Sequence, residues 1–172
     1  TIWADESIRC DHIGQTVFQV QQSKPKTHLE YVAEQDLLPR EHVNYLNSLN
    51  INPKVIYDIG ACVLHWTRHA KTKWPNADYY LIDAAESVEP FLDKSNDSWA
   101  IEVLSNEDGK EIIFYEDSEN PGGNSYYLET TGAFTDQHAR IRKTITLDTL
   151  VKEENWPKPD LIKMDVQGAE ID

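Results

Sequence analysis

The chain has 172 residues, which at roughly 150 residues per domain allows one domain with little left over. Its 16 Lys and Arg against 30 Asp and Glu give a formal net charge of −14, which argues against binding to nucleic acid or to an anionic membrane surface. Hydrophobic residues make up 40%, enough for one core, and no apolar run approaches the ~20 residues of a membrane span.

Two cysteines, Cys10 and Cys62, give neither a disulfide framework nor the spacing of a metal site. The sequence opens on Thr1 without a charged and then apolar leader, so it predicts no signal peptide. These features together predict an acidic, cytoplasmic protein.

Residues 1–53 are predicted to form an arm and helices. The first 28 residues show no sustained period and indicate an irregular arm. Apolar residues then recur at helical spacing from Leu29 to Leu37, and a second short helix is expected over 43–49.

Residues 54–172 form the second predicted unit, in which strands and helices alternate. The predicted strands cover 55–59, 79–82, 99–104, 111–115, 143–146 and 160–165, and the predicted helices cover 63–74, 88–92 and 147–154. Ser87 is expected to cap the second of these helices, and the turn-rich stretch 117–138 is expected to be mostly loop. This alternation predicts an α/β fold with a doubly wound, mostly parallel sheet.

Three predicted strands end in an acid, namely Asp58, Asp83 and Asp165. Ligands of a doubly wound sheet bind beyond the carboxyl ends of its strands, near the switch point. Any one of these acids could be a turn residue or a helix cap, but three at equivalent positions favour a ligand site.

The loop at 60–65 distinguishes two cofactors that bind such folds. The pyrophosphate of a dinucleotide needs the glycines of G-x-G-x-x-G, whereas this loop has one glycine and follows the carboxylate of Asp58. S-adenosylmethionine carries a sulfonium and an ammonium group and no phosphate, so acids around it are favourable. Asp83, 25 residues after Asp58, suits the ribose hydroxyls of either cofactor. The loop therefore favours S-adenosylmethionine.

Two segments resemble the FkbM-type S-adenosylmethionine-dependent methyltransferases. They are VIYDIGA at 55–61 and PDLIKMDVQGAE at 159–170, of which the second is more specific, and TLDTL at 146–150 also fits the family. The resemblance implies a class I, Rossmann-like fold with helices on both faces of the sheet. It also implies methyl transfer, commonly to a hydroxyl oxygen of a sugar or a similar natural product.

The resemblance assigns individual residues to the cofactor. They are Asp58, Gly60, Ala61, Cys62, Asp83, Ser105 and Asn106. The first three would lie under the methionine and ribose, Asp83 on the ribose hydroxyls, and the last two beside the adenine. Cys62 belongs to the same loop, where a small packing residue is the other interpretation.

The chain departs from the family pattern at four positions. The family usually has Asn, Gly, Glu and Glu where this chain has Cys62, Leu64, Asp83 and Gln167. Cys62 and Leu64 are expected to crowd the cofactor loop. The class I sheet has three more strands after the one that ends at Asp165, so we expect the C-terminal strands to be missing and the chain to be a fragment.

Catalysis on an oxygen nucleophile needs a base or a cation. Asp165 is the predicted base, or a metal carboxylate, at the end of its strand. Lys163 shares a strand face with Asp165, in a strand predicted to be buried on both faces. Lys163 either forms a structural ion pair with Asp165 or Glu170, or orients Asp165 or the acceptor oxygen.

A divalent metal has little support from the sequence. His65 and His69 stand four residues apart on a predicted helix, which is a metal-compatible spacing, but no third ligand lies near them in the sequence. A surface or packing role is favoured for both, and no metal site is predicted.

The acceptor pocket is assigned to Asn124 and Ser125, because polar side chains next to tyrosines suit a sugar; an ordinary glycine turn is the other interpretation. The predicted partner is a small-molecule or glycan acceptor, and the sequence predicts no oligomeric state. The main hypothesis is an O-methyltransferase. A non-catalytic ligand-binding or interaction domain and an NAD-dependent dehydrogenase are the alternatives.

Overall fold

A parallel sheet of four strands forms the centre of the computed structural model, which describes residues 26–35, 41–119, 121–127 and 135–166. In sheet order its strands are β3 (Ser98–Ile101), β2 (Asp78–Asp83), β1 (Val55–Ile59) and β7 (Leu161–Met164). Every neighbouring pair is parallel, so all four carboxyl ends lie at one edge of the sheet. The predicted α/β class with a parallel sheet is confirmed.

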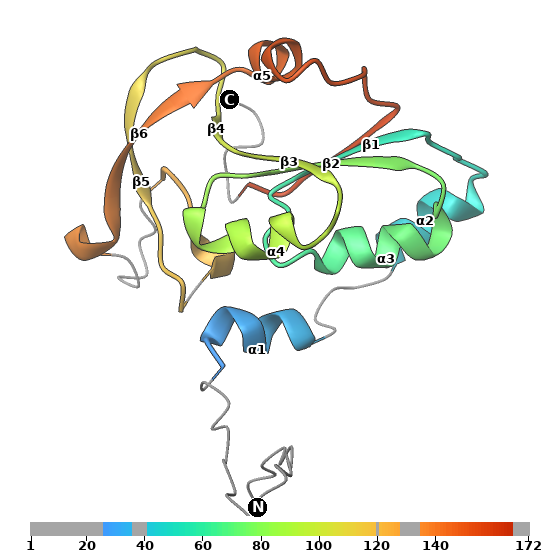
Figure 1. The fold of residues 1–172 in the computed structure, drawn as a ribbon, viewed down its shortest axis with the longest axis horizontal. Coiled ribbons are helices and arrows are strands. Elements are labelled where there is room, and N and C mark those ends of the chain that lie inside the picture. The colour runs from blue at the N-terminus through green and yellow to red at the C-terminus, as the bar shows by residue number, and fades with distance from the viewer. Residues whose placement is uncertain (1–25, 36–40, 120, 128–134, 167–172) are drawn as a thin grey trace, which may run out of the picture.

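A second, smaller sheet lies toward the carboxyl ends of these strands (Figure 1). Its order is β4 (Val103–Leu104), β6 (Ala139–Ile145) and β5 (Glu111–Tyr115). The single strand predicted over 99–104 is wrong, because the chain changes sheets at Glu102. The Glu102 N–H donates to the backbone carbonyl of Asp83 in β2, whereas the Ser105 N–H donates to the backbone carbonyl of Ile145 in β6.

Helices cover both faces of the parallel sheet. Figure 1 shows α3 (His65–Lys73) and α4 (Glu89–Asp93) on one face and α5 (Leu147–Glu153) on the other. Alternate residues of β1 point to opposite faces, so Ile56 packs in the core beneath α3 while Tyr57 packs in the core that Leu150 of α5 closes. None of the helices in the described residues is long and apolar enough to cross a membrane.

The two N-terminal helices pack on the same core as the sheet. They are α1 (His28–Glu34), which starts with a Thr27 capping box, and α2 (Glu41–Ser48). Leu29 and Val43 are buried in one cluster with Ile56. Both predicted helices are present, although α1 ends at Glu34 and the rest of the predicted stretch up to Leu37 lies almost entirely outside the described residues. The predicted arm also lies almost entirely outside the described residues, and the division at residue 53 stays a prediction.

The predicted helix over 88–92 is a 3-10 turn followed by a short α-helix. A 3-10 turn, η1 (Glu86–Val88), leads into α4, and Ser87 caps neither of them. Asp83 accepts the N–H of Ala85, which begins the turn before Ser87 is reached. The Ser87 N–H donates instead to the carboxylate of Glu116, so the predicted cap is wrong.

The segment 117–138 holds two 3-10 turns, η2 (Pro121–Gly123) and η3 (Asp136–His138), and its residues 128–134 lie outside the described part. Ser125 forms a bridge with Tyr115 of β5. The strand β6 begins four residues before the predicted one at Lys143, because its residues from Ala139 on pair with β5.

β7 is less buried than predicted. Ile162 and Met164, which share one face of the strand, are each 42% exposed. Within the described residues β7 pairs only with β1 and ends the sheet, so its outer side lacks the covering that a central strand has.

Candidate active site at the carboxyl ends of the strands

A cavity of about 200 Å³ opens where the carboxyl ends of the parallel sheet meet the second sheet. It brings together seven of the residues predicted from the sequence: Gly60, Cys62, Asp83, Ser105, Asn124, Ser125 and Asp165. They come from the ends of β1, β2, β4 and β7 and from the segment after β5.

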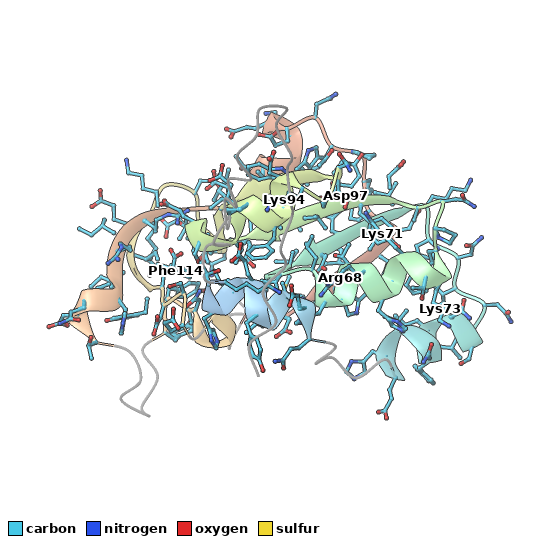
Figure 2. The ribbon with its side chains drawn as sticks, turned by 60° about the horizontal axis from the view of Figure 1, so that its bottom comes forward. Arg68, Lys71, Lys73, Lys94, Asp97 and Phe114 are labelled. Atoms are coloured by element: carbon cyan, nitrogen blue, oxygen red, sulfur yellow. The ribbon has the colours of Figure 1, made fainter. Side chains whose placement is uncertain are left out.

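The cavity is acidic. Three carboxylates line it, from Asp83, Glu102 and Asp165, and no Lys, Arg or His occurs among its lining residues in the described part of the chain. Figure 2 shows the cations of α3 on a different part of the molecule from Phe114, which lines the cavity. A positively charged ligand fits this environment.

Glu102 was missed by sequence reasoning. Burial raises the pKa of its carboxyl, and the nearby Arg142 guanidinium acts against this. The sequence feature that could have indicated Glu102 is an acid inside an otherwise apolar run. In the structure this acid lies where the chain leaves one sheet for the other.

The Asp83 carboxylate organises the loop beside the cavity. Its Oδ2 accepts the N–H of Cys62 at 2.8 Å and its Oδ1 accepts the N–H of Ala85 at 2.9 Å. Burial raises the pKa of Asp83, while these two hydrogen bonds lower it. Each carboxylate oxygen has a second lone pair, so Asp83 keeps capacity for a ligand.

Asp58 is fully buried and does not line the cavity. Thr67 of α3 donates its hydroxyl to Asp58 Oδ2, and Lys163 Nζ lies 3.0 Å from Asp58 Oδ1. Burial raises the pKa of the Asp58 carboxyl, against the lowering effects of Lys163 and Thr67. Asp58 therefore belongs to an internal network that joins β1, α3 and β7.

Lys163 pairs with Asp58 more closely than with Asp165. Its Nζ is 4.0 Å from Asp165 Oδ2, and it donates to the carbonyl oxygen of Gly60 at 2.7 Å. The predicted shared face of Lys163 and Asp165 is consistent with this geometry, but the nearest charged partner is a residue that the sequence did not suggest. Lys163 thus binds the loop after β1 without lining the cavity.

Three residues of this loop have left-handed backbone conformations. Gly60, Cys62 and Leu64 have φ of 74°, 46° and 69°. Gly and Asn adopt this region most readily, so the Asn and Gly expected at 62 and 64 suit the backbone better than Cys and Leu. Leu64 points into the hydrophobic core rather than lining the cavity, so the predicted crowding at this position is wrong.

The first three N–H groups of the loop are already used. The N–H groups of Gly60 and Ala61 donate to the Ile82 carbonyl at 2.8 and 3.1 Å, and that of Cys62 donates to Asp83. A pyrophosphate needs free N–H groups at this point. This bonding disfavours a dinucleotide.

Gly60 lies against the end of β7. A Cβ at this position would come within 1.9 Å of the Asp165 carbonyl oxygen, so only glycine fits. Asp165 itself has a side chain 56% exposed at the cavity, and its N–H donates to the Ile59 carbonyl at 3.1 Å.

The remaining predicted residues lie away from the cavity. Ala61 is buried in the core, and Asn106 is exposed. His65 is hydrogen-bonded through Nε2 to the Val32 carbonyl of α1, and no group of three potential metal ligands occurs among the described residues. Gln167 and Glu170 lie outside the described part of the chain.

A comparison with protein families identifies the chain. A family model described as the methyltransferase FkbM domain matches residues 26–172, which includes α1 and α2 as well as the sheet. Comparisons with curated proteins and with solved structures give no match. The chain belongs to the FkbM methyltransferase family.

Proposed function

We propose that this member of the FkbM methyltransferase family binds S-adenosylmethionine in the acidic cavity and methylates a hydroxyl oxygen of a sugar or similar small molecule. The observation that carries the proposal is the set of three carboxylates, with no described cationic side chain among them, at the carboxyl ends of parallel strands. The doubly wound class I arrangement is part of the same proposal.

The residues present fit this cofactor. Asp83 offers carboxylate oxygens to ribose hydroxyls, and the side chains of Leu104 and Phe114 offer apolar contacts to a base. A carboxylate cavity favours a sulfonium and an ammonium group, and the occupied N–H groups of the loop disfavour a diphosphate. When bound, the sulfonium supplies an activated methyl group.

Asp165 is the proposed base. Its half-exposed carboxylate faces the cavity and would accept the proton that the acceptor hydroxyl loses as the new O–C bond forms and the S–C bond breaks. Lys163 is proposed as a positioning residue, because it holds the Gly60 carbonyl and Asp58 without lining the cavity. Alignment of the acceptor with the methyl group would account for much of the rate.

Thermal unfolding with ligands tests the proposal. We expect S-adenosylmethionine and S-adenosylhomocysteine to raise the melting temperature of the chain, and NAD to leave it unchanged. Release of S-adenosylhomocysteine with a panel of glycans and small hydroxylated acceptors would then identify the acceptor. Stabilisation by neither cofactor would favour a non-catalytic domain, and stabilisation by NAD alone would favour a dehydrogenase.

A further inference from the structure

Asn124 carries a polar group that the proposed function has not used. Its side-chain Oδ1 accepts the backbone N–H of Asp117 at 2.8 Å, which fixes the orientation of the amide. The other end, Nδ2, is buried and has no hydrogen-bond partner among the described residues. A buried donor without a partner is costly, so this group is expected to be satisfied by a ligand.

Asn124 differs chemically from the rest of the cavity. The charged side chains that line it are carboxylates, which only accept hydrogen bonds when ionised, and its hydroxyls both donate and accept. Asn124 is the sole lining residue of the described chain with a side-chain N–H. Carboxylates bind the cationic groups of a ligand and accept hydrogen bonds from its hydroxyls. Because Nδ2 can only donate, the ligand atom opposite it must be a hydrogen-bond acceptor.

The position of Asn124 selects one part of the ligand. Glu116 accepts the N–H of Ser87 in η1, the turn that follows β2, and Tyr115 pairs with Ser125. This segment is therefore attached near the Asp83 end of the cavity. Gly60 and Asp165 mark the other end, one and two strands further along the sheet. The ribose and base are expected on the Asp83 side, and the methionine on the Gly60 side.

We propose that Asn124 Nδ2 donates a hydrogen bond to an acceptor nitrogen of the adenine ring and so selects the base of the cofactor. This rests on the proposed function and reassigns Asn124 from the acceptor pocket to the cofactor site. The amide then closes the base end of the cavity, opposite the methyl-transfer end at Asp165.

The test compares two ligands on variants of the whole chain. Asn124→Ala is expected to weaken S-adenosylhomocysteine and 5′-methylthioadenosine by the same factor, about tenfold, since both contain the base and only the first contains the amino-acid part. Asn124→Asp keeps the oxygen that accepts from Asp117 and removes the donor, so it should lose at least as much. Asn76→Ala, an exposed Asn before β2, is the matched control and should change neither affinity.

The outcomes separate this inference from the proposed function. If the unaltered chain binds neither ligand, the proposed function fails. If it binds both and Asn124→Ala weakens only S-adenosylhomocysteine, Nδ2 serves the amino-acid carboxylate and the inference is overturned. If Asn124→Ala changes the affinity of neither ligand, the inference is also overturned, and Asn124 is again assigned to the pocket of the methyl acceptor. Deaza forms of methylthioadenosine, in which one ring nitrogen is replaced by CH, identify the nitrogen that Asn124 binds. Replacing that nitrogen should lower the affinity for the unaltered chain and leave the affinity for Asn124→Ala unchanged.

Discussion

Asp58 and Asp83 end neighbouring strands of one sheet, yet their surroundings differ completely. Asp58 is fully buried beneath α3, where it contacts Lys163 and Thr67. Asp83 lines the cavity and accepts two backbone N–H groups from the surrounding loops. The side chain of a strand-end acid can follow the strand into the core or turn with the loop toward a ligand, and its position in the sequence does not say which.

The loop from Gly60 to Leu64 connects the two regions. Lys163 holds its Gly60 carbonyl from the Asp58 side, and Asp83 holds its Cys62 N–H from the cavity side. The internal network and the cavity side therefore hold the same loop at different atoms. Because Asp58 itself does not line the cavity, we expect it to act mainly on stability and Asp83 mainly on ligand binding.

The largest effect is expected from Lys163→Met. Removing the cation leaves the Asp58 carboxyl buried without its charged partner, so the free energy of unfolding should fall by about 3–5 kcal/mol and activity should fall with it. Urea unfolding measures the loss, with Lys152→Met on the exposed surface of α5 as the control. A stable variant that binds cofactor but does not transfer methyl groups would instead make Lys163 catalytic.

The stability that Lys163→Met loses should also depend on pH. Burial raises the pKa of Asp58, and Lys163 opposes this, so Lys163→Met should raise that pKa further. A carboxyl with a raised folded-state pKa lowers stability as pH rises through it, because the unfolded chain releases the proton more easily. The stability deficit of Lys163→Met should thus be smaller at about pH 5 than at about pH 8. Adding Asp58→Asn should remove most of this difference; an equal deficit at both pH values would show that Asp58 is not its source.

Asp83→Ala tests the cavity side. It should weaken S-adenosylmethionine by roughly 1.5–3 kcal/mol, the range for hydrogen bonds to a charged group, as measured by calorimetry. Asp78→Ala, an exposed acid at the opposite end of β2, should leave the affinity unchanged. Unaltered affinity in Asp83→Ala would mean that this carboxylate serves only the N–H groups of Cys62 and Ala85.

Gly60→Ala tests the place where the two regions meet. Gly60 and Gly109 share a φ of 74°, but an added Cβ meets the Asp165 carbonyl at the first and nothing within 4 Å at the second. The left-handed cost is common to both, so the loss of stability in Gly60→Ala should exceed that in Gly109→Ala by about 1–3 kcal/mol. Equal losses in thermal or urea unfolding would show that the loop and the end of β7 separate freely.

Local patterns predicted the strands better than the contacts between them. The apolar run at 55–59 coincides with β1, and the strand-end acids fall at the expected edge of the sheet. The partner of Lys163 could not be predicted, because the register that sets it opposite Asp58 joins strands 105 residues apart in the sequence. Likewise the sequence places Glu102 inside a predicted strand. Its position at the cavity follows from the change of sheets at that residue, which the local pattern does not contain.

The loop shows a different limit. Its single glycine disfavours a dinucleotide, which stays a prediction. The left-handed conformations of Cys62 and Leu64 depend on Asp83 and on core packing, which sequence spacing does not contain. The departures from the family pattern at 62 and 64 predict crowding of the cofactor loop, which is wrong at Leu64 and stays a prediction at Cys62, because only Cys62 lines the cavity. The structure makes them positions of backbone strain, which a substitution can relieve.

Cys62→Asn is the prediction with the smallest effect. Cys62 has a φ of 46°, which Asn tolerates better, so the variant should gain about 0.5–1 kcal/mol in the free energy of unfolding. The mirror control is Asn155→Cys at an exposed left-handed position of φ 53°, which should lose a similar amount. Burial and the nearby Asp83 raise the pKa of the Cys62 thiol to about 11, so replacing it removes no thiolate at neutral pH. If Asn155→Cys loses stability while Cys62→Asn gains none, the hydrogen bond from the Cys62 N–H to Asp83, rather than backbone strain, controls the stability of this loop.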